Sequence, residues 1–305
     1  MIRYLVLMSL LSSLLYSQPK TFGGHSMVAP LQRVLVKRPD TSFGVSDIQK
    51  WHYTAVPDVE RAQEEHDDFV ATLKQEGVEV LYHLASLPDH ADALFVHDPV
   101  LITNKGAIIL SMGKALRRGE EDAIEKTLNS LQIPTLYKLH GDARAEGGDI
   151  VWLDDSTLAI GRGFRTNDEG IRQITNAVTP LGVKVITVDL PYDQGEHACL
   201  HLQSLISLVD YKIALVYKKL LAVPFITYLE KQGFTLLEVP EHEYQTMGPN
   251  VLAIAPKVCL TIQCNPDTKK TLELVGCKVY TYKGDEISLK AEGGATCLTR
   301  PLLRQ

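Results

Sequence analysis

The sequence has only five cysteines among its 305 residues, and they are Cys199, Cys259, Cys264, Cys277 and Cys297. An odd and sparse set is a poor disulfide framework, and a chain of this length does not need one. Only Cys259 and Cys264 lie near each other, and without a partnering His or Cys pair their spacing is weak evidence for zinc. For the first four cysteines we therefore expect buried, small hydrophobic side chains.

The chain also lacks a surplus of positive charge. Its net charge of −6 and its pI of about 5.9 argue against a nucleic-acid scaffold, which needs a basic surface. No linker rich in proline, glycine or serine divides the chain. A content of 45% hydrophobic and 22% charged residues is typical of a globular protein with a sizeable core. The length fits one large domain or two ordinary ones.

The N-terminal residues 1–17 carry one positive charge and then mostly apolar and small residues, which resembles a secretory signal peptide. The segment is too short to span a bilayer comfortably, and no cleavage site follows it cleanly. The alternative is a start codon assigned too early, with the protein beginning near Met27, just before a convincing strand at residues 31–37. We predict an N-terminal extension over residues 1–26 and a single catalytic domain over residues 27–305.

Five short β-rich stretches recur along the chain, and four of them open with glycine. They cover residues 75–84, 131–139, 181–190, 232–240 and 275–283, and they align on Gly77, Gln132, Gly182, Gly233 and Gly276. Each follows a helix-like segment, at residues 59–74, 120–130, 169–179, 225–231 and 267–274. Further strands are expected at residues 94–103, 150–159, 205–217, 251–262 and 286–290.

One such unit cannot cover both faces of its own sheet, whereas five units in a ring would bury their inner faces against one another. The fold class predicted from this repetition is α/β, with pseudo-fivefold strand–helix units in a ring. Loops between the strands would then converge near the ring axis, where a ligand cleft is expected.

Three stretches with reactive side chains fall where the repeats would converge. Glu146 precedes two glycines, which would let the backbone approach a ligand closely, although such a stretch is more often a turn. His201 stands at the start of an apolar run, where a lone histidine is usually structural. Cys297 follows Gly-Gly-Ala-Thr, whose amides we expect to be exposed, and Arg300-Pro301 should end regular structure soon afterwards. Such a thiol is reactive only if amides and a histidine lower its pKa.

Taken together, a carboxylate, a histidine and a cysteine in this order resemble the guanidino-group modifying enzymes, a superfamily of amidinotransferases, arginine deiminases and dimethylarginine dimethylaminohydrolases. Residues 95–98 (FVHD) resemble an F-x-x-D substrate strand, and residues 161–170 resemble a G-x-S-x-R-T-N-x-x-G stretch. Arg117-Arg118 also falls at the family's spacing. The resemblance covers about residues 28–304, is closest to the dimethylarginine dimethylaminohydrolases, and implies a five-bladed α/β propeller, the pentein fold.

The resemblance implies a role for seven residues. Cys297 would attack the guanidino carbon as a thiolate, His201 would protonate the leaving amine and then activate water, and Glu146 and Asp98 would hold the guanidinium. Asp92 would contact the α-amino end of the substrate, while Arg117 and Arg165 would bind its carboxylate. Two departures concern substrate choice, because Glu292 stands where many dimethylarginine hydrolases have Asp and His97 where they often have Glu.

The predicted activity is hydrolysis of arginine or an Nω-methylated arginine to citrulline and ammonia or an amine, through a covalent thiouronium intermediate. An arginine deiminase or an amidinotransferase with the same residues is the first alternative, and a non-catalytic propeller that only binds is the second. No cofactor and no metal are expected, and the partner is a small guanidino molecule rather than a nucleic acid or a membrane. A homodimer is one option for the assembly. An unpaired reactive Cys297 favours the cytoplasm, with export as the alternative if residues 1–17 are a signal peptide.

Overall fold

The structure, a computed structural model, describes residues 20–45 and 47–305, so the signal-like segment 1–17 lies outside the described residues. The strands are β1 (Leu31–Val36), β2 (Glu79–Tyr82), β3 (Val100–Thr103), β4 (Gly106–Ile109), β5 (Thr135–Lys138), β6 (Ile150–Asp154), β7 (Thr157–Arg162), β8 (Lys184–Asp189), β9 (Ile206–Asp210), β10 (Ile213–Val216), β11 (Thr235–Glu238), β12 (Leu252–Ala255), β13 (Val258–Ile262), β14 (Lys278–Tyr282) and β15 (Arg300–Arg304). The helices are α1 (Ile48–Trp51), α2 (Val59–Gln75), α3 (Glu120–Ser130), α4 (Asp168–Val178), α5 (Val223–Lys231), α6 (Glu241–Tyr244) and α7 (Pro266–Leu274).

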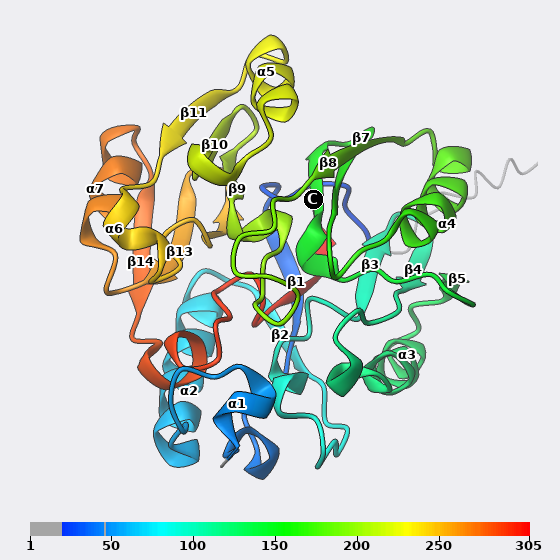
Figure 1. Ribbon diagram of the computed structural model, residues 1–305, viewed down its shortest axis with the longest axis vertical. Helices are drawn as coiled ribbons and strands as arrows, with labels where there is room; N and C mark the ends of the chain where they lie inside the picture. Colours follow the sequence, from blue (N-terminus) through cyan, green and yellow to red (C-terminus); the bar gives the residue numbers. More distant parts are fainter. Residues whose placement is uncertain (1–19, 46) are drawn as a thin grey trace, which may run out of the picture.

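The strands form five sheets of three, with the orders β15-β1-β2, β3-β4-β5, β6-β7-β8, β9-β10-β11 and β12-β13-β14. In every sheet the middle strand pairs antiparallel with one neighbour and parallel with the other. Figure 1 shows the sheets around a common centre, with α2, α3, α4, α5 and α7 on the outside. The predicted α/β class and its fivefold repetition are confirmed.

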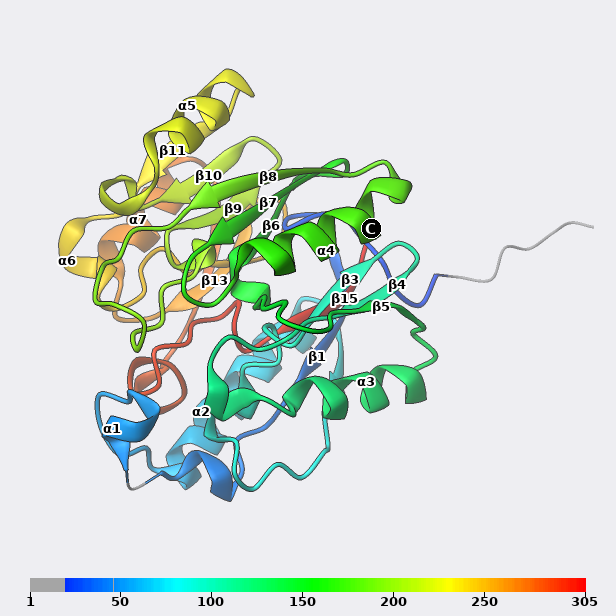
Figure 2. The ribbon, with the colours of Figure 1, turned by 45° about the vertical axis from the view of Figure 1, so that its right-hand side comes forward.

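Each long helix leads into the parallel strand of its sheet, because a parallel pair needs a crossover connection. In α2, Ala62, Phe69 and Leu73 share one buried face, and the helix packs on β2 and β14. Figure 2 shows α3 and α4 likewise lying along the outer side of their sheets. Among the described helices, none combines the length and the apolar content needed to cross a membrane.

All five residues on which the repeats align lie in the left-handed region. Gly77, Gly182, Gly233 and Gly276 have φ values of +80°, +79°, +78° and +83°, and Gln132 has +60°. Glycine adopts this conformation without strain and ends helices there, whereas an L-residue with a side chain is strained. The five helices therefore end in the same way, and one of them does so at an energetic cost.

We expect the substitution Gln132→Gly to raise the free energy of unfolding by about 0.5–1 kcal/mol, because it relieves that strain at an exposed position. The matched reverse change, Gly182→Gln, should lower it by about 1–2 kcal/mol. A Cβ at Gly182 meets no atom within 4 Å, so backbone strain is the main cost there. Urea unfolding of both variants measures the two effects, and a Gln132→Gly protein less stable than its parent would contradict the argument.

Two of the expected strands were wrong, one entirely and one in part. Residues 286–290 form no strand, and residues 286–289 belong to a single π-helical turn, Asp285–Leu289. The carboxylate of Glu65 on α2 accepts the amides of Glu286 and Ile287 at 2.8 and 3.2 Å, which holds this turn against the helix. Residues 94–103 were also only partly a strand, since they start in the 3-10 turn Ala91–Leu94 and become β3 at Val100.

Regular structure does not end at Arg300-Pro301, as the sequence suggested. Both residues belong to β15, which pairs antiparallel with β1 and places Pro301 opposite Val34. A proline is tolerated here because β15 is an edge strand of its sheet. The first sheet is thus assembled from the two ends of the described chain, which a search for consecutive repeats could not find.

The described part of the predicted extension makes contacts with the sheets. The amide of Gly23 donates to the carbonyl oxygen of Leu302 at 2.8 Å, and the amide of Arg304 donates to the carbonyl oxygen of Gly23 at 2.9 Å. The ring of His25 stacks on Trp152 with 4.1 Å between the centroids. The division of the chain at residue 26 stays a prediction.

Candidate active site

The three predicted catalytic residues and Asp98, which was predicted to bind the substrate, come from turns that directly precede the first strand of a sheet. Asp98 precedes β3, Glu146 precedes β6, His201 precedes β9 and Cys297 precedes β15. Because the sheets lie around a common centre, these turns meet there (Figure 1). Asp98, His201 and Cys297 line one cavity, and Glu146 is fully buried beside His201.

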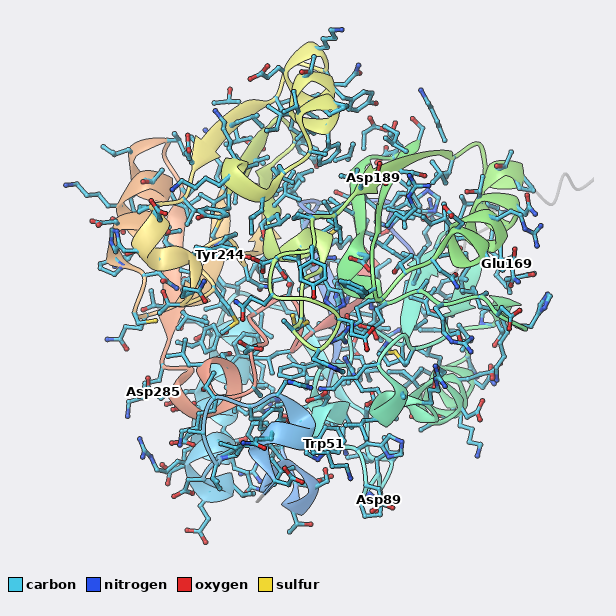
Figure 3. The ribbon with its side chains drawn as sticks, viewed as in Figure 1. Trp51, Asp89, Glu169, Asp189, Tyr244 and Asp285 are labelled. Carbon is cyan, nitrogen blue, oxygen red and sulfur yellow. The ribbon has the colours of Figure 1, made fainter. Side chains whose placement is uncertain are left out.

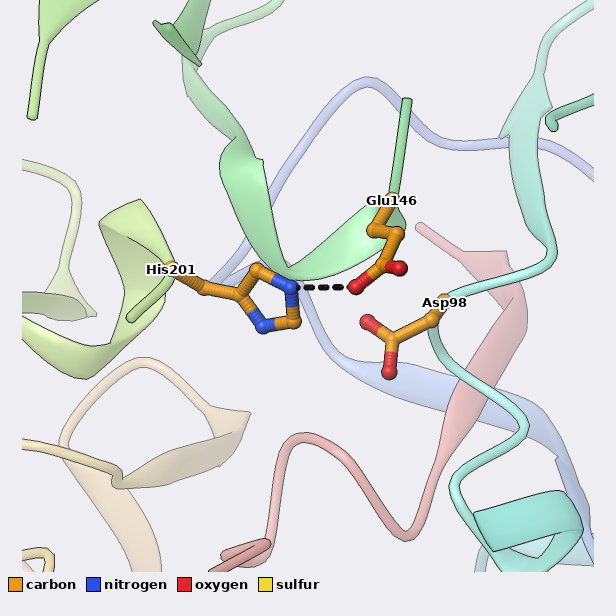
Figure 4. Close-up of side chains that lie close together, drawn as sticks. All are labelled: Asp98, Glu146 and His201. Carbon is orange, nitrogen blue, oxygen red and sulfur yellow. Dashed lines mark hydrogen bonds and ion pairs between the residues drawn. The ribbon is translucent and has the colours of Figure 1, made fainter. Parts of the chain in front are cut away.

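Glu146 and His201 form a buried pair in which the carboxylate oxygen Oε2 lies 2.7 Å from the ring nitrogen Nε2 (Figure 4). Burial favours the neutral carboxyl group, but Arg165 and His201 hold the pKa of Glu146 well below its usual range. Burial also opposes a charged imidazole, yet the neighbouring Cys199, Asp149 and Asp98 raise the pKa of His201 well above 6.5. The pair is therefore a carboxylate and an imidazolium at neutral pH, and the imidazolium can act as an acid.

Asp98 is held by two hydrogen bonds, one from a charged side chain and one from a backbone amide. Its Oδ2 accepts a hydrogen bond from Arg117 at 2.6 Å, and its Oδ1 accepts the amide of Gly148 at 2.9 Å. Burial alone would raise the pKa of Asp98, but the charges of Arg117 and His201 lower it. The cavity thus contains a second ionised carboxylate, and Figure 4 shows it beside the Glu146–His201 pair.

The two glycines after Glu146 allow close contacts between parts of the protein itself. A Cβ on Gly147 would collide with the carbonyl oxygen of His97, and a Cβ on Gly148 would collide with the ring of His201. The sequence had suggested close approach of the backbone to a ligand. The structure shows instead that the glycines let the turns of Asp98, Glu146 and His201 pack closely on each other.

Cys297 lies in a more apolar setting than its glycine-rich flanks suggested. Ala295 and Leu298 are fully buried, and the cysteine itself packs against a cluster of buried hydrophobic side chains. Burial raises the pKa of the Cys297 thiol to about 11, partly offset by His201. The expectation of exposed amides around this cysteine was wrong. A positive charge brought into the cavity would favour the thiolate.

All three residues predicted to bind the ends of the substrate line the same cavity, namely Asp92, Arg117 and Arg165. The guanidinium of Arg117 donates to Asp98, to Glu120 at 2.8 Å and to the carbonyl oxygen of Phe95 at 3.0 Å, so most of its donors are used inside the protein. Arg165 makes longer contacts, at 3.3 Å to Glu146 and 3.3 Å to the carbonyl oxygen of Ala198. Arg165 is therefore the freer of the two arginines.

Sequence reasoning missed three residues beside the proposed site, Asn250, Lys114 and Cys199. Asn250 accepts the amide of Thr296 at 3.0 Å, and its Nδ2 lies 3.6 Å from the sulfur of Cys297. It precedes β12, the first strand of the fifth sheet, so its place in the repeat was the available signal. Lys114 and Cys199 line the cavity, and the sulfur of Cys199 lies 3.6 Å from Nδ1 of His201.

Asp98, Glu146 and His201 also offer ligand atoms within 4.8 Å of one another, which is close enough for a metal ion. Within the described residues these atoms already have partners, since His201 pairs with Glu146 and Asp98 pairs with Arg117. A second group, His242, Glu243 and Asp267, is partly exposed. Glu243 there accepts the first amides of α7, which is ordinary helix capping.

Comparison with known proteins identifies the family. A family model described as "N,N dimethylarginine dimethylhydrolase, eukaryotic" matches residues 48–304. The chain belongs to the dimethylarginine dimethylaminohydrolase family. It is 28% identical over 243 residues to the N(G),N(G)-dimethylarginine dimethylaminohydrolase of Pseudomonas aeruginosa, covering 80% of this chain and 89% of that protein. The enzyme of the same name from Streptomyces coelicolor is 27% identical over 270 residues, covering 88% and 96% of the two chains.

Two solved structures, one of a dimethylarginine dimethylaminohydrolase and one of an amidinotransferase, have a similar fold. The Pseudomonas aeruginosa dimethylarginine dimethylaminohydrolase in complex with citrulline has a TM-score of 0.75 and 25% identity, and it covers 90% of this chain and 100% of that chain. An amidinotransferase from Microseira wollei has a TM-score of 0.75 at 16% identity and covers 93% and 97% of the two chains, which shows the fold alone.

The two departures from the dimethylarginine hydrolases lie in different surroundings. His97 is buried, with Nδ1 2.8 Å from the carbonyl oxygen of Thr299 and Nε2 2.9 Å from the amide nitrogen of Gln203. Burial lowers the pKa of His97 to about 3, so it is a neutral link between the turns of Cys297 and His201. Glu292 lines the cavity itself. Of the two, only Glu292 is in the lining of the cavity.

Proposed function

We propose that this chain is a cysteine-dependent hydrolase of guanidino groups, with arginine and Nω-methylated arginines as the candidate substrates, yielding citrulline and ammonia or a methylated amine. The observation that supports it is one cavity that joins the thiol of Cys297, the carboxylate of Asp98 and the imidazole of His201, which is paired with Glu146. A guanidinium is flat, cationic and weakly electrophilic, so its hydrolysis needs carboxylates to fix it, a strong nucleophile and an acid.

In the first half of the proposed reaction the sulfur of Cys297 attacks the guanidino carbon as a thiolate. The thiol has a pKa of about 11 without substrate, and the positive charge of the bound guanidinium, held by Asp98 and Glu146, favours loss of the thiol proton to solvent as the substrate binds. His201 then donates a proton to the nitrogen that leaves as the amine. The carbon–nitrogen bond breaks, and a thiouronium joins the substrate to Cys297.

In the second half a water molecule attacks the same carbon. His201, now neutral, takes the proton from the water, and the carbon–sulfur bond breaks to return the thiolate. The product loses its remaining proton to solvent and carries a neutral ureido group. The enzyme regains its imidazolium, and the thiolate of Cys297 takes up a proton when the product leaves. Burial alone would lower the pKa of His201, but the acidic groups around it raise that pKa. A protonated His201 suits the role of acid in the first half of the reaction.

The same proposal includes the architecture that brings these turns together. We take residues 27–305 as a single catalytic domain in which the five sheets close into a propeller. Supporting this, the first strands of adjacent sheets pack together, as β9 does with β12 and β15 with β3. A homodimer and a location in the cytoplasm stay predictions.

A substrate panel tests the function. The purified protein is incubated with arginine and with mono- and dimethylated arginines, and both the ureido product and the released ammonia or amine are measured. Release of dimethylamine with citrulline supports a dimethylarginine hydrolase, and release of ammonia from arginine alone supports a deiminase. Transfer to an added amine without citrulline would instead indicate an amidinotransferase. Binding without any product would contradict the proposal.

A further inference from the structure

Asp92 is the cavity carboxylate that was predicted to contact the α-amino end of the substrate, and both of its oxygens already accept hydrogen bonds from the protein. Its Oδ2 accepts a hydrogen bond from the ammonium nitrogen of Lys114 at 2.6 Å, and its Oδ1 accepts the hydroxyl of Tyr53 at 2.9 Å. Asp92 is 4% exposed, so little water reaches it. Each oxygen therefore has a partner supplied by the protein.

Lys114 is held in this position from several sides. Its ammonium also donates to the carbonyl oxygen of Trp51 at 2.9 Å and lies 5.4 Å from the centroid of the Trp51 ring. Its backbone amide donates to Oε1 of Glu146 at 2.9 Å. Trp51 lies at the end of α1 (Figure 3). The lysine is thus a fixed part of the cavity wall, and a second ammonium near Asp92 would meet its charge.

Asp98 and Glu146 lie beside His201, where they are placed for the guanidinium rather than for the other end of a substrate. Glu292 lines the wall that this cavity shares with a second one, and its carboxyl group already interacts with the charges of Lys114 and Arg165. Beyond Lys114 the cavity continues into an outer groove that is also lined by Arg165 and Lys50. The acid of that groove, Glu196, faces His197 at 3.8 Å. A substrate tail that leaves along this groove meets mainly positive charge.

We infer that Lys114 takes the place of a substrate ammonium on Asp92, and that this enzyme prefers guanidino substrates whose tail ends in a carboxylate without a neighbouring ammonium. The inference rests on the proposed guanidino hydrolysis. Arg165, whose contacts inside the protein are long, and the ammonium of Lys114 are the groups that would bind the carboxylate. The preferred class is therefore the ω-guanidino carboxylic acids.

The test compares arginine with 5-guanidinopentanoate, which is arginine without its α-amino group, and with agmatine, which lacks the carboxylate. We expect kcat/KM for 5-guanidinopentanoate to exceed that for arginine by roughly tenfold or more, with agmatine the poorest. If the substrate panel shows a preference for a methylated guanidino group, the three compounds are compared with their guanidino groups methylated in the same way. Arginine turned over at least as well as 5-guanidinopentanoate would overturn the inference while leaving guanidino hydrolysis intact.

The substitution Lys114→Met keeps a long side chain against Trp51 and removes the charge. It should shift the ratio of kcat/KM values toward arginine by roughly tenfold or more, because Asp92 becomes free for the ammonium. Lys278→Met is the matched control, since Lys278 also pairs with a carboxylate, Glu76 at 3.0 Å, and lies 4.6 Å from the centroid of the Tyr280 ring, but lines neither the cavity nor the outer groove. The control should change the ratio by less than about twofold, and equal shifts in both variants would contradict the assignment to Lys114.

Binding gives a readout that does not depend on turnover. Isothermal titration calorimetry on a Cys297→Ser protein should show tighter binding of 5-guanidinopentanoate than of arginine. If no compound is hydrolysed by the parent enzyme, the proposed function fails, and the order of affinities still decides the inference. Tighter binding of arginine would overturn it.

Discussion

Replacing Cys297 with serine should abolish turnover of every guanidino substrate while the protein stays folded. Serine nearly matches the shape of cysteine, so Asn250 and Thr296 keep their contacts, but its hydroxyl is a far weaker nucleophile at neutral pH. A loss of at least about 1,000-fold in kcat is expected. Formation of the ureido product measures activity, and thermal unfolding of the variant measures folding.

The matched control for this substitution is Cys264→Ser. The expectation of a buried side chain was wrong for Cys199 and Cys264, which are exposed. Cys264 lines neither of the two cavities that contain Cys297, so its loss should leave kcat unchanged within error. Near-normal activity of the Cys297→Ser protein, with the control also active, would reject Cys297 as the nucleophile. An unfolded Cys297→Ser protein would be replaced by Cys297→Ala, which removes the sulfur without adding a polar atom.

The pH dependence of the Cys297 thiol follows from its surroundings. Burial raises its pKa to about 11, and only the thiolate reacts with iodoacetamide, so alkylation of the free enzyme should accelerate as the pH rises from 8 toward that value. A bound guanidinium that does not react should shift this profile to lower pH because its charge favours the thiolate. Mass spectrometry after brief alkylation identifies the modified residue.

Much of the fold was predictable because its signals are local. Period-two runs, amphipathic helices and helix-ending glycines each depend on a few neighbouring residues, and the repetition made them visible five times. Even Gln132, which breaks the glycine pattern, was found by its place in the repeat. The first sheet was partly missed because β15 and β1 are joined only in space, and the turn at Asp285–Leu289 because a distant Glu65 determines it.

For the candidate site, too, one part could be predicted from the sequence and another part could not. Asp98, Glu146, His201 and Cys297 could be predicted because their order along the chain matches a family pattern. The contacts that each of these side chains makes could not be predicted in this way. The occupation of Asp92 by Lys114 joins residues that are separated by a turn and a hairpin, and the burial of Cys297 depends on side chains from other sheets. The consequences for substrate choice and for the thiol pKa therefore required the structure.

Replacing His201 with glycine should separate the two halves of the reaction. Without the imidazole there is no acid for the leaving amine and no base for the attacking water, so kcat should fall by roughly 100-fold to 10,000-fold. A substrate whose leaving group needs less protonation, such as a thiocitrulline with an S-methyl group, should still form the thiouronium on Cys297. The adduct should then persist, because its hydrolysis also needs His201.

Intact-protein mass spectrometry measures this outcome as a mass increase on the His201→Gly protein, which a peptide digest should assign to Cys297. The double variant with Cys297→Ser is the control and should gain no mass. The His201 ring is tightly packed, because a Cβ on Gly148 would collide with it. Replacing His201 with glycine therefore leaves a space beside Glu146 that added imidazole can fill. Imidazole should therefore speed decay of the adduct. An adduct that decays as fast as the parent enzyme turns over would show that another group activates the water.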